Sequence, residues 1–257
     1  MSLNFCFIGA GNLATHLSKA FRNKGFKITQ VYSRTEQSAK KLAGSLSANF
    51  TSSLNEIDKS VDIYFVAIKD SVIDEVLSQI DFENKLIVHC SGSLPLLSIE
   101  KYSENIGVFY PLQTFSKNRD INFDEIPIFI EANSVQNEEL LIRIANKISN
   151  SVSVIDSEKR KVLHISAVFA CNFVNYFFTV AAEILKSKDI PFDVLRPLIL
   201  ETANKVQEMN PEDAQTGPAI RFDENIINSH LNELNEFDEY QELYKSISKS
   251  IFKHNNK

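Results

Sequence analysis

The sequence predicts an α/β fold in which a doubly wound, mostly parallel sheet is followed by an all-α C-terminal domain. Two observations support this. Up to about residue 156, short apolar runs alternate with stretches of helical periodicity, as in successive β-α-β units. Beyond residue 156 only helical periodicity remains. We therefore place a domain boundary at this point, which gives one domain over 1–156 and a second over 157–257.

The predicted strands are short apolar runs that end at glycine or polar residues. They cover residues 3–8, 27–32, 62–67, 86–89, 107–110, 126–131 and 152–155. Helical spacing predicts intervening helices over 12–24, 35–43, 70–80 and 135–148. In the second of these, Thr35 is the expected N-cap and Gly44 the expected end.

The C-terminal domain is predicted to begin with a long helix over 157–186. A second helix is expected over 193–209, with Pro197 tolerated near its first turn. A break rich in proline and glycine then leads to a tail. Apolar residues recur in this tail at alternating three- and four-residue steps, which predicts one more helix with a narrow apolar stripe.

Composition and charge exclude several classes of protein. The 257 residues are 44% hydrophobic and 23% charged, the mix of a soluble globular protein. A net charge of −6 argues against a nucleic-acid partner. Three cysteines without paired spacing indicate reduced thiols rather than disulfides or a metal site. The first lysine is Lys19, so no signal peptide is expected and we predict a cytoplasmic protein.

One segment imitates a membrane span. Residues 165–182 carry no charge and follow the basic triplet 159–161. Polar side chains interrupt this run, and amides in lipid are costly. The interrupting residues are Ser166, Asn172, Asn175 and Thr179. We therefore expect no membrane partner. The helix is instead predicted to be the centre of a helical core or the interface of a homodimer formed through the helical domain.

The N-terminal segment FIGAGNLATHL has the spacing of a dinucleotide-binding turn. Gly9 and Gly11 stand in a G-x-G pattern between a predicted strand and a predicted helix, and Ala14 takes the place of the third glycine. Gly9 permits a tight turn, and Gly11 lets the backbone approach a pyrophosphate at the helix N-terminus. The predicted contacts are Gly9, Ala10, Gly11, Asn12 and Leu13. The alternative is a strand–turn–helix that merely needs glycine.

The end of the second strand favours NADP over NAD. NAD-binding units often place a carboxylate there to accept the ribose hydroxyls. This chain has Ser33, Arg34 and Thr35 instead, a guanidinium and two hydroxyls suited to a 2′-phosphate. The alternative is that Arg34 is a solvated loop charge.

Two further strand ends are expected to border the same crevice. Ala67, Ile68 and Lys69 follow one strand and are predicted to line the ribose or the nicotinamide. Ser91 follows the next strand. Lys69 could equally be a solvated residue of a first helical turn. His89 and Cys90 are interpreted as core residues.

A second constellation carries candidate catalytic groups. His164 and Asn172 fall on one face of the long helix at 3.6 residues per turn, together with Asn175. We expect His164 to donate a proton, and Asn172 to anchor a carbonyl or imine. Gln113, on a turn stiffened by Pro111, is expected to help orient the substrate. The alternatives are an ordinary surface turn and a satisfied polar network across a dimer interface. No set of metal ligands emerges.

These motifs carry a family resemblance. The chain resembles Rossmann-like proteins with a C-terminal helical domain of unknown function, through stretches such as FIGAGNLATHL, VYSRT, FYPLQTFS and QTGPAIRFD. Its first half is similar to pyrroline-carboxylate reductase and to the deazaflavin-dependent NADP oxidoreductase. Its overall architecture more distantly resembles the 6-phosphogluconate and β-hydroxyacid dehydrogenases. The resemblance implies that the long helix closes over the nicotinamide and that dimers form through the helical domains.

The resemblance assigns the glycine turn to the pyrophosphate, residues 33–35 to the 2′-phosphate and residues 67–69 to the ribose or nicotinamide. One departure concerns the hydroxyacid enzymes, which place a catalytic lysine four residues before an asparagine of the long helix. Here that position is Val168, four residues before Asn172. Proton transfer would therefore fall to His164.

Two hypotheses follow. The first is an NADP(H)-dependent oxidoreductase that transfers a hydride between the nicotinamide and a small carbonyl, imine or hydroxy substrate. The second is a non-catalytic NADP-binding sensor or partner module. Tight NADPH binding without turnover would distinguish the second from the first.

Overall fold

The computed structural model describes residues 3–256. The chain divides into two compact units, Met1–Asn172 and Phe173–Lys257. The predicted boundary at residue 156 marks the end of the sheet region, whereas the two units separate further along the helix that follows. The end of the sheet and the division into compact units are separate properties of the chain, so the domain boundary at residue 156 stays a prediction.

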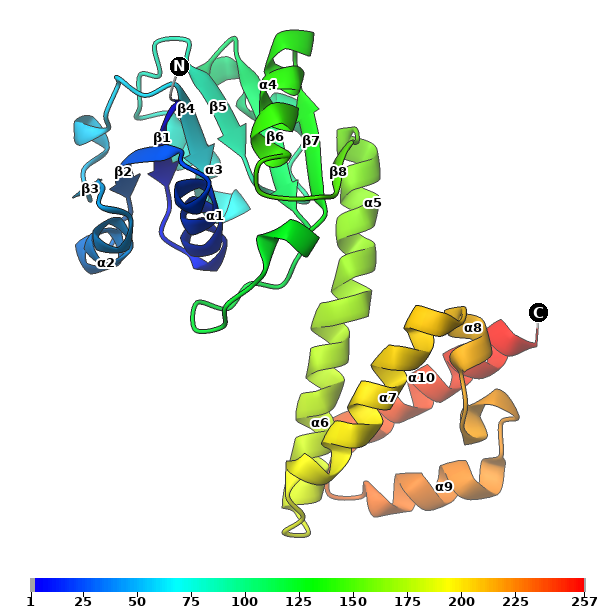
Figure 1. The fold of residues 1–257 in the computed structure, drawn as a ribbon. Coiled ribbons are helices and arrows are strands. Elements are labelled where there is room, and N and C mark those ends of the chain that lie inside the picture. The colour runs from blue at the N-terminus through cyan, green and yellow to red at the C-terminus, as the bar shows by residue number, and fades with distance from the viewer. Residues whose placement is uncertain (1–2, 257) are drawn as a thin grey trace. The chain divides into compact units, whose positions relative to one another are not determined.

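The first unit contains one eight-stranded sheet in the order β3-β2-β1-β4-β5-β6-β7-β8 (Figure 1). Every neighbouring pair is parallel except β6 and β7, which are antiparallel. The predicted mostly parallel, doubly wound sheet is confirmed. Its strands are β1 (Asn4–Ile8), β2 (Lys27–Tyr32), β3 (Asn49–Thr51), β4 (Ile63–Val66), β5 (Leu86–His89), β6 (Ile106–Pro111), β7 (Ile128–Ala132) and β8 (Val152–Val154).

Helices cover both faces of this sheet. The apolar side chains of α1 (Asn12–Asn23), α2 (Glu36–Leu46) and α4 (Val135–Ala145) pack on one face. The other face is covered by α3 (Ile73–Leu77) and a 3₁₀ segment over Leu96–Tyr102. The sheet is therefore buried on both sides, as an α/β fold requires.

A cluster of phenylalanine rings fixes α1 on the sheet. The Phe21 ring of α1 is fully buried, and its centroid lies 5.2 Å from Phe5, 4.9 Å from Phe65 and 5.5 Å from Phe109. Edge-on and tilted pairs at these distances add to the stabilisation from burial. The N-terminus of α1 is therefore held at the carboxyl ends of the central strands.

The structure corrects the predicted end of α2. The helix does not stop at Gly44 but runs on to Leu46. Its termination is left to Ser47, which adopts the left-handed conformation with φ 55° and ψ 40°. The sequence predicts an end at Gly44 because glycine is the usual residue in the left-handed conformation that ends a helix. A serine takes this role here, and buried Leu46 adds one more apolar contact to α2.

Other differences concern short or weakly patterned elements. The predicted helix over 70–80 is a 3₁₀ turn over Asp70–Val72 followed by the short α3. The three-residue strand β3 and the helix α9 (Glu224–Glu233) were not predicted. Three residues are too few to show strand periodicity, and α9 buries only Ile227.

The long predicted helix is present but changes its winding in the middle. It comprises α5 (Ser157–Ala167), a π-helical segment over Val168–Phe173 and α6 (Val174–Lys186). In a π segment the backbone hydrogen bonds span five residues instead of four, and such segments are frequent at functional sites. The helix passes from the first unit to the second at the end of this segment.

The second unit is helical, with α7 (Arg196–Glu208), α8 (Pro211–Ala214), α9 and α10 (Asp238–Asn255) after α6. The predicted all-α character of the C-terminal region is confirmed. Tyr240 of α10 donates a hydrogen bond to Glu183 of α6, and Nδ1 of His230 lies 2.8 Å from the Tyr244 hydroxyl. Within the described residues of this unit, few apolar residues are buried. They are Ala219, Ile227 and Leu234.

Within residues 3–256, one helix is long and apolar enough to cross a membrane. It spans Ser157–Lys186, with a mean hydropathy of 1.6 in its most apolar window. That window is not buried within the single chain.

Candidate functional site

The turn after β1 brings two backbone segments into close approach. Gly9 has φ +122°, a conformation that favours glycine. A Cβ atom on Gly9 would lie 2.3 Å from the carbonyl oxygen of Ala67 and 3.0 Å from Cγ2 of Ile68. The tight turn predicted for Gly9 is therefore needed by the structure itself, and it places residues 67–68 directly beside the glycine turn.

The N-terminus of α1 is open toward solvent. Gly11 is the N-cap residue. Among residues 3–256, no side chain caps the helix, and apart from Gly11 and its chain neighbours no atom lies within 4 Å of the position a Gly11 Cβ would take. The first N–H groups of α1 therefore have no partner within the helix and lie at the positive end of a helix dipole, with Asn12 exposed and Leu13 partly exposed. This arrangement fits a pyrophosphate. The side-chain amide of Asn12 instead donates to the carbonyl of Phe115 at 2.8 Å.

The end of β2 presents its polar residues to solvent. The backbone N–H of Ser33 donates to the carbonyl of Thr51, while Arg34 and Thr35 are exposed. Over the described part of the chain, no carboxylate pairs with the Arg34 guanidinium. Burial raises the pKa of the neighbouring Tyr32, and the Arg34 charge partly opposes this. The guanidinium is thus free to contact an anionic ligand.

Lys69 and Ser91, two further residues predicted to contact the cofactor, differ in their surroundings. Lys69 is exposed at the start of the 3₁₀ turn over Asp70–Val72. The hydroxyl of Ser91 donates to Asp70 at 2.7 Å and accepts from the N–H groups of Ser93 and Leu94. Ser91 therefore shapes the loop after β5 through its side chain.

A cavity of about 560 Å³ brings the three predicted catalytic residues together. Gln113, His164 and Asn172 all line it. The other lining residues are Tyr110, Leu112, Thr114, Leu163, Ser166, Ala167, Val168, Ala170 and Cys171. None of these described residues carries a carboxylate, an ammonium or a guanidinium group. The cavity thus combines apolar walls with neutral hydrogen-bonding groups.

The π segment determines what the long helix contributes to this cavity. Its residues Val168, Ala170, Cys171 and Asn172 all line the wall. The prediction that Asn175 shares the face of His164 assumed regular α-helical winding. Asn172 lines the cavity with His164, and Asn175, further along the helix axis, is not among the lining residues, so the shared face of the three residues stays a prediction.

The His164 ring is held from two sides. Its Nδ1 atom lies 2.9 Å from the Tyr110 hydroxyl, and the two rings meet edge-on with centroids 5.9 Å apart. A Cβ atom on Gly92 would lie 2.6 Å from both Cγ and Nδ1 of His164, so the ring rests directly on the Gly92 backbone. Burial raises the pKa of Tyr110, and the charge of Arg160 partly opposes this.

A buried ion pair anchors the helix that carries His164. Arg160 is 1% exposed, and its guanidinium pairs with Glu131 of β7 and donates to the carbonyl of Leu94 at 2.5 Å. Ser157 donates to the same carboxylate at 2.8 Å. Its hydroxyl also accepts from the Leu96 N–H at 2.9 Å. The first turn of α5 is therefore fixed to both β7 and the loop after β5, one turn before His164.

His89 and Cys90 lie in the core, as the sequence predicts. His89 has no exposed surface, and its Nδ1 accepts from the N–H of Ser91 at 3.2 Å. Burial, assisted by the charge of Arg160, lowers the pKa of His89 to about 3, so its ring stays neutral. Burial raises the pKa of the Cys90 thiol to about 12.

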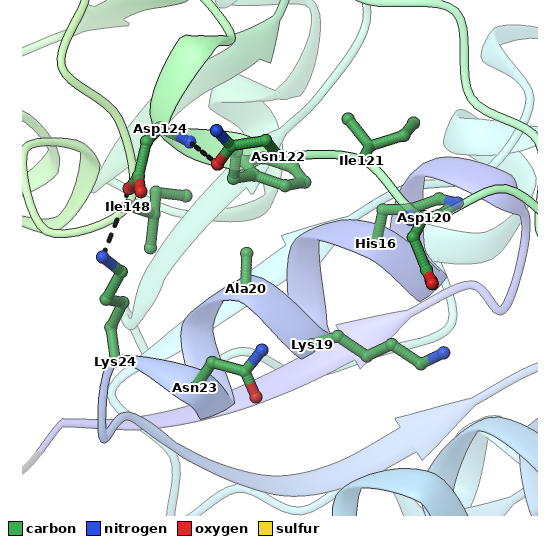
Figure 2. A pocket seen from close by; sticks show the side chains of 11 residues that line it. His16, Lys19, Ala20, Asn23, Lys24, Asp120, Ile121, Asn122, Asp124 and Ile148 are labelled. Atoms are coloured by element: carbon green, nitrogen blue, oxygen red, sulfur yellow. Dashed lines mark hydrogen bonds and ion pairs between the residues drawn. The ribbon is translucent and has the colours of Figure 1, made fainter.

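A second, smaller cavity of about 370 Å³ lies between α1 and the segment over residues 120–124 (Figure 2). Figure 2 shows the ion pair between Lys24 and Asp124 at its rim, with Nζ and Oδ1 3.2 Å apart. His16 contributes to the wall, and its Nε2 lies 2.9 Å from the carbonyl of Ser116. None of the residues predicted for cofactor or substrate line this cavity, so we assign the candidate active site to the larger one.

Sequence reasoning missed three features of the site. Tyr110 lies in the stretch FYPLQTFS, but no local pattern marks it as the partner of His164. Gly92, on which the His164 ring lies, and Cys171, which lines the cavity, carry no prediction from the sequence. The position of Tyr110 at the carboxyl end of a strand, just before Pro111, is the signal that could have identified it.

Comparisons with known proteins agree with this geometry. Residues 4–92 match the family described as NADP oxidoreductase coenzyme F420-dependent, and residues 126–251 match a domain of unknown function, DUF2520. The crystal structure of a candidate NADP oxidoreductase from Bacteroides fragilis is 50% identical to the chain, with a TM-score of 0.95 and 98% of each chain covered. The chain belongs to this family of NADP oxidoreductases. The resemblance to the deazaflavin-dependent NADP oxidoreductase and the expectation of an NADP-dependent oxidoreductase are confirmed.

More distant solved structures share the fold. An imine reductase from Myxococcus stipitatus, in complex with NADP⁺, is 17% identical over 97% of this chain and 92% of its own, with a TM-score of 0.68. A 1-pyrroline-5-carboxylate reductase from Streptococcus pyogenes is 13% identical over 98% and 99%, with a TM-score of 0.64. No curated protein gives a significant match.

The contact between Gly92 and His164 leads to a prediction about stability. We expect Gly92→Ala to destabilise the protein by about 1–3 kcal/mol, because the new methyl group overlaps the His164 ring. The same change in a His164→Ala background should cost less than half as much, since the overlapping ring is gone. Chemical denaturation of the four proteins of this cycle measures both values. Equal costs in the two backgrounds would contradict the contact.

Proposed function

We propose that the protein transfers a hydride between NADP(H) and a small carbonyl, imine or hydroxy substrate. One observation carries the proposal. The segment after β6 connects the two halves of the site, because Gln113 and Thr114 line the cavity while the next residue, Phe115, accepts a hydrogen bond from Asn12 at the start of α1. The open helix N-terminus and the neutral cavity are therefore parts of one region of the first unit.

Each part of this region has a proposed task. The turn over Gly9, Ala10, Gly11, Asn12 and Leu13 binds the pyrophosphate through backbone N–H groups. Arg34, with Ser33 and Thr35, contacts the 2′-phosphate. The remaining cofactor contacts are assigned to the strand ends that border the crevice. They are Ala67, Ile68, Lys69 and Ser91.

The bound nicotinamide supplies or accepts the hydride. His164 gives a proton to the substrate oxygen or nitrogen in reduction and removes it in oxidation. Gln113 and Asn172 orient the reacting group through their amides. The absence of charged side chains from the described lining favours a substrate whose reacting end is neutral. The reductases of the same fold act, by their names, on imines and pyrroline carboxylate, which supports this choice of substrate class.

The alternative of a non-catalytic NADP sensor is not favoured by any feature of the site. A sensor has no need for a proton-transferring side chain in the cavity beside the cofactor turn. The lysine of the hydroxyacid dehydrogenases is missing at Val168, but His164 occupies the same cavity wall one turn earlier.

The role of His164 is tested by substitution. His164→Ala should leave the Kd of NADPH unchanged and lower turnover by roughly 10²–10⁴-fold, since one general acid is lost. The measurement is NADPH oxidation with a panel of small aldehydes, ketones and cyclic imines. His254→Ala, at an exposed histidine of α10, is the control. Unchanged turnover in His164→Ala would remove this role. Tight NADPH binding without turnover of any panel member would favour the sensor.

Arg34 tests the choice of cofactor. Arg34→Ala should weaken NADPH binding by about tenfold or more and affect NADH little, because only NADPH carries the 2′-phosphate. Calorimetric titration with both nucleotides measures the difference. Lys40→Ala removes another exposed positive charge from α2 and should change neither affinity. Equal losses for NADPH and NADH in Arg34→Ala would overturn the assignment.

We also propose that the protein is a cytoplasmic homodimer formed through the helical unit. Large apolar side chains of α6 and α7 remain exposed in the single chain, with Leu198 62% and Leu200 61% accessible. Apolar surface of this extent usually marks an interaction site. A second copy of the chain is always available to cover this surface.

The cytoplasmic location rests on the cysteines. They are free, two of them are buried, and free thiols suit a reducing compartment.

The dimer is tested by sedimentation. Replacing Leu198 and Leu200 together by aspartate should yield a monomer, because the two positions lie on different faces of α7 and a charge would be buried in the interface whichever face it uses. Glu201→Gln, on the same helix, should leave the dimer intact. A wild-type monomer would contradict the proposal. Wild-type protein that partitions into liposomes would indicate that the apolar helix meets lipid instead.

A further inference from the structure

Tyr110 is a rigid neighbour of His164. It lies within β6, where it pairs with Phe129 of the adjacent β7, and its side chain is 8% exposed. A strand residue enclosed in this way cannot move its hydroxyl far. The hydroxyl has one hydrogen-bond partner over the described residues, Nδ1 of His164.

The two nitrogens of His164 therefore face different surroundings. Nδ1 is engaged by Tyr110, and the Cγ–Nδ1 side of the ring rests on Gly92. Nε2 has no hydrogen-bond partner in the described part of the chain, although the ring lines the cavity. The anchored first turn of α5 holds the backbone of His164 in place. Nε2 is thus the nitrogen left for a ligand.

We propose that Tyr110 is a positioning residue of the reaction, which reserves Nε2 of His164 as the atom that exchanges a proton with the substrate. This inference rests on the proposed function, in which His164 transfers the proton. In reduction, the protonated ring releases the Nε2 proton to the substrate oxygen or nitrogen. The ring becomes neutral and keeps its other proton on Nδ1, which donates a hydrogen bond to the Tyr110 oxygen. A proton from solvent then returns to Nε2.

A hydroxyl suits this position better than a carboxylate or an amide N–H. It accepts from Nδ1–H in the protonated ring and in the neutral ring that keeps its proton on Nδ1, and it adds no negative charge that would hold the second proton on the ring, so the ring stays held through the proton transfer. Because burial raises the pKa of Tyr110, the phenol keeps its own proton. The charged groups nearby are Arg160 and its partner Glu131, while His89 on β5 is neutral.

The test compares Tyr110→Phe with the wild type. This change removes one oxygen and keeps the ring, so the fold and the Kd of NADPH should be unchanged. We expect kcat to fall about tenfold, with little change in KM, because the loss of one hydrogen bond misplaces the proton donor. In the His164→Ala background Tyr110→Phe should have no further effect. The matched control is Tyr102→Phe, which removes a hydroxyl bonded to Asp74 outside the cavity.

A spectroscopic readout separates positioning from general structural support. In protein labelled with ¹⁵N-histidine, the His164 signals are those lost in His164→Ala. The wild type should show one dominant neutral tautomer at His164, and Tyr110→Phe should show both, while Tyr102→Phe should match the wild type. Unchanged tautomers and kcat in Tyr110→Phe would overturn the inference. If His164→Ala itself keeps full turnover, the proposed function fails at His164, a result distinct from the failure of the role of Tyr110.

Discussion

The buried ion pair between Arg160 and Glu131 is the constraint on which the candidate site depends. It joins the first turn of the long helix to the sheet, and its hydrogen bonds to Leu94 and Ser157 fix the loop after β5 as well. A buried guanidinium without its carboxylate would be strongly unfavourable, so the helix has one position against β7. That position places His164 against both Tyr110 and Gly92, from two other strand ends.

The end of β6 and the segment that follows it connect binding to chemistry. Tyr110 holds the histidine, Gln113 lines the cavity, and Phe115 is bonded to the N-terminus of α1. Residues 110–115 therefore extend from the partner of the proposed proton donor, His164, to the partner of Asn12 at the proposed pyrophosphate site. A shift of this segment would affect cofactor and substrate together, which is consistent with its fastening to α1 by both Asn12 and His16.

The parts of the site that depend on local sequence could be predicted, and the parts that depend on long-range contacts could not. Gly9 and Gly11 predict the dinucleotide-binding turn because its tight backbone needs glycine at particular spacings. The contact of Tyr110 with His164 joins residues 54 positions apart, and no periodicity reports it. The π segment likewise follows no simple pattern of residues, so a helix predicted from periodicity is drawn with regular winding throughout. Gly44 is a local signal that misleads, because the helix α2 continues through this glycine to Leu46.

Cys171 gives the π segment a practical consequence. The other two cysteines, Cys6 and Cys90, are buried, and burial raises the pKa of both thiols well above that of a free cysteine. Cys171 is partly accessible and lines the cavity. A thiol-directed fluorophore would therefore attach at one place, the inner wall of the reaction chamber. Its emission would report occupancy by small molecules directly, even before a natural substrate is known.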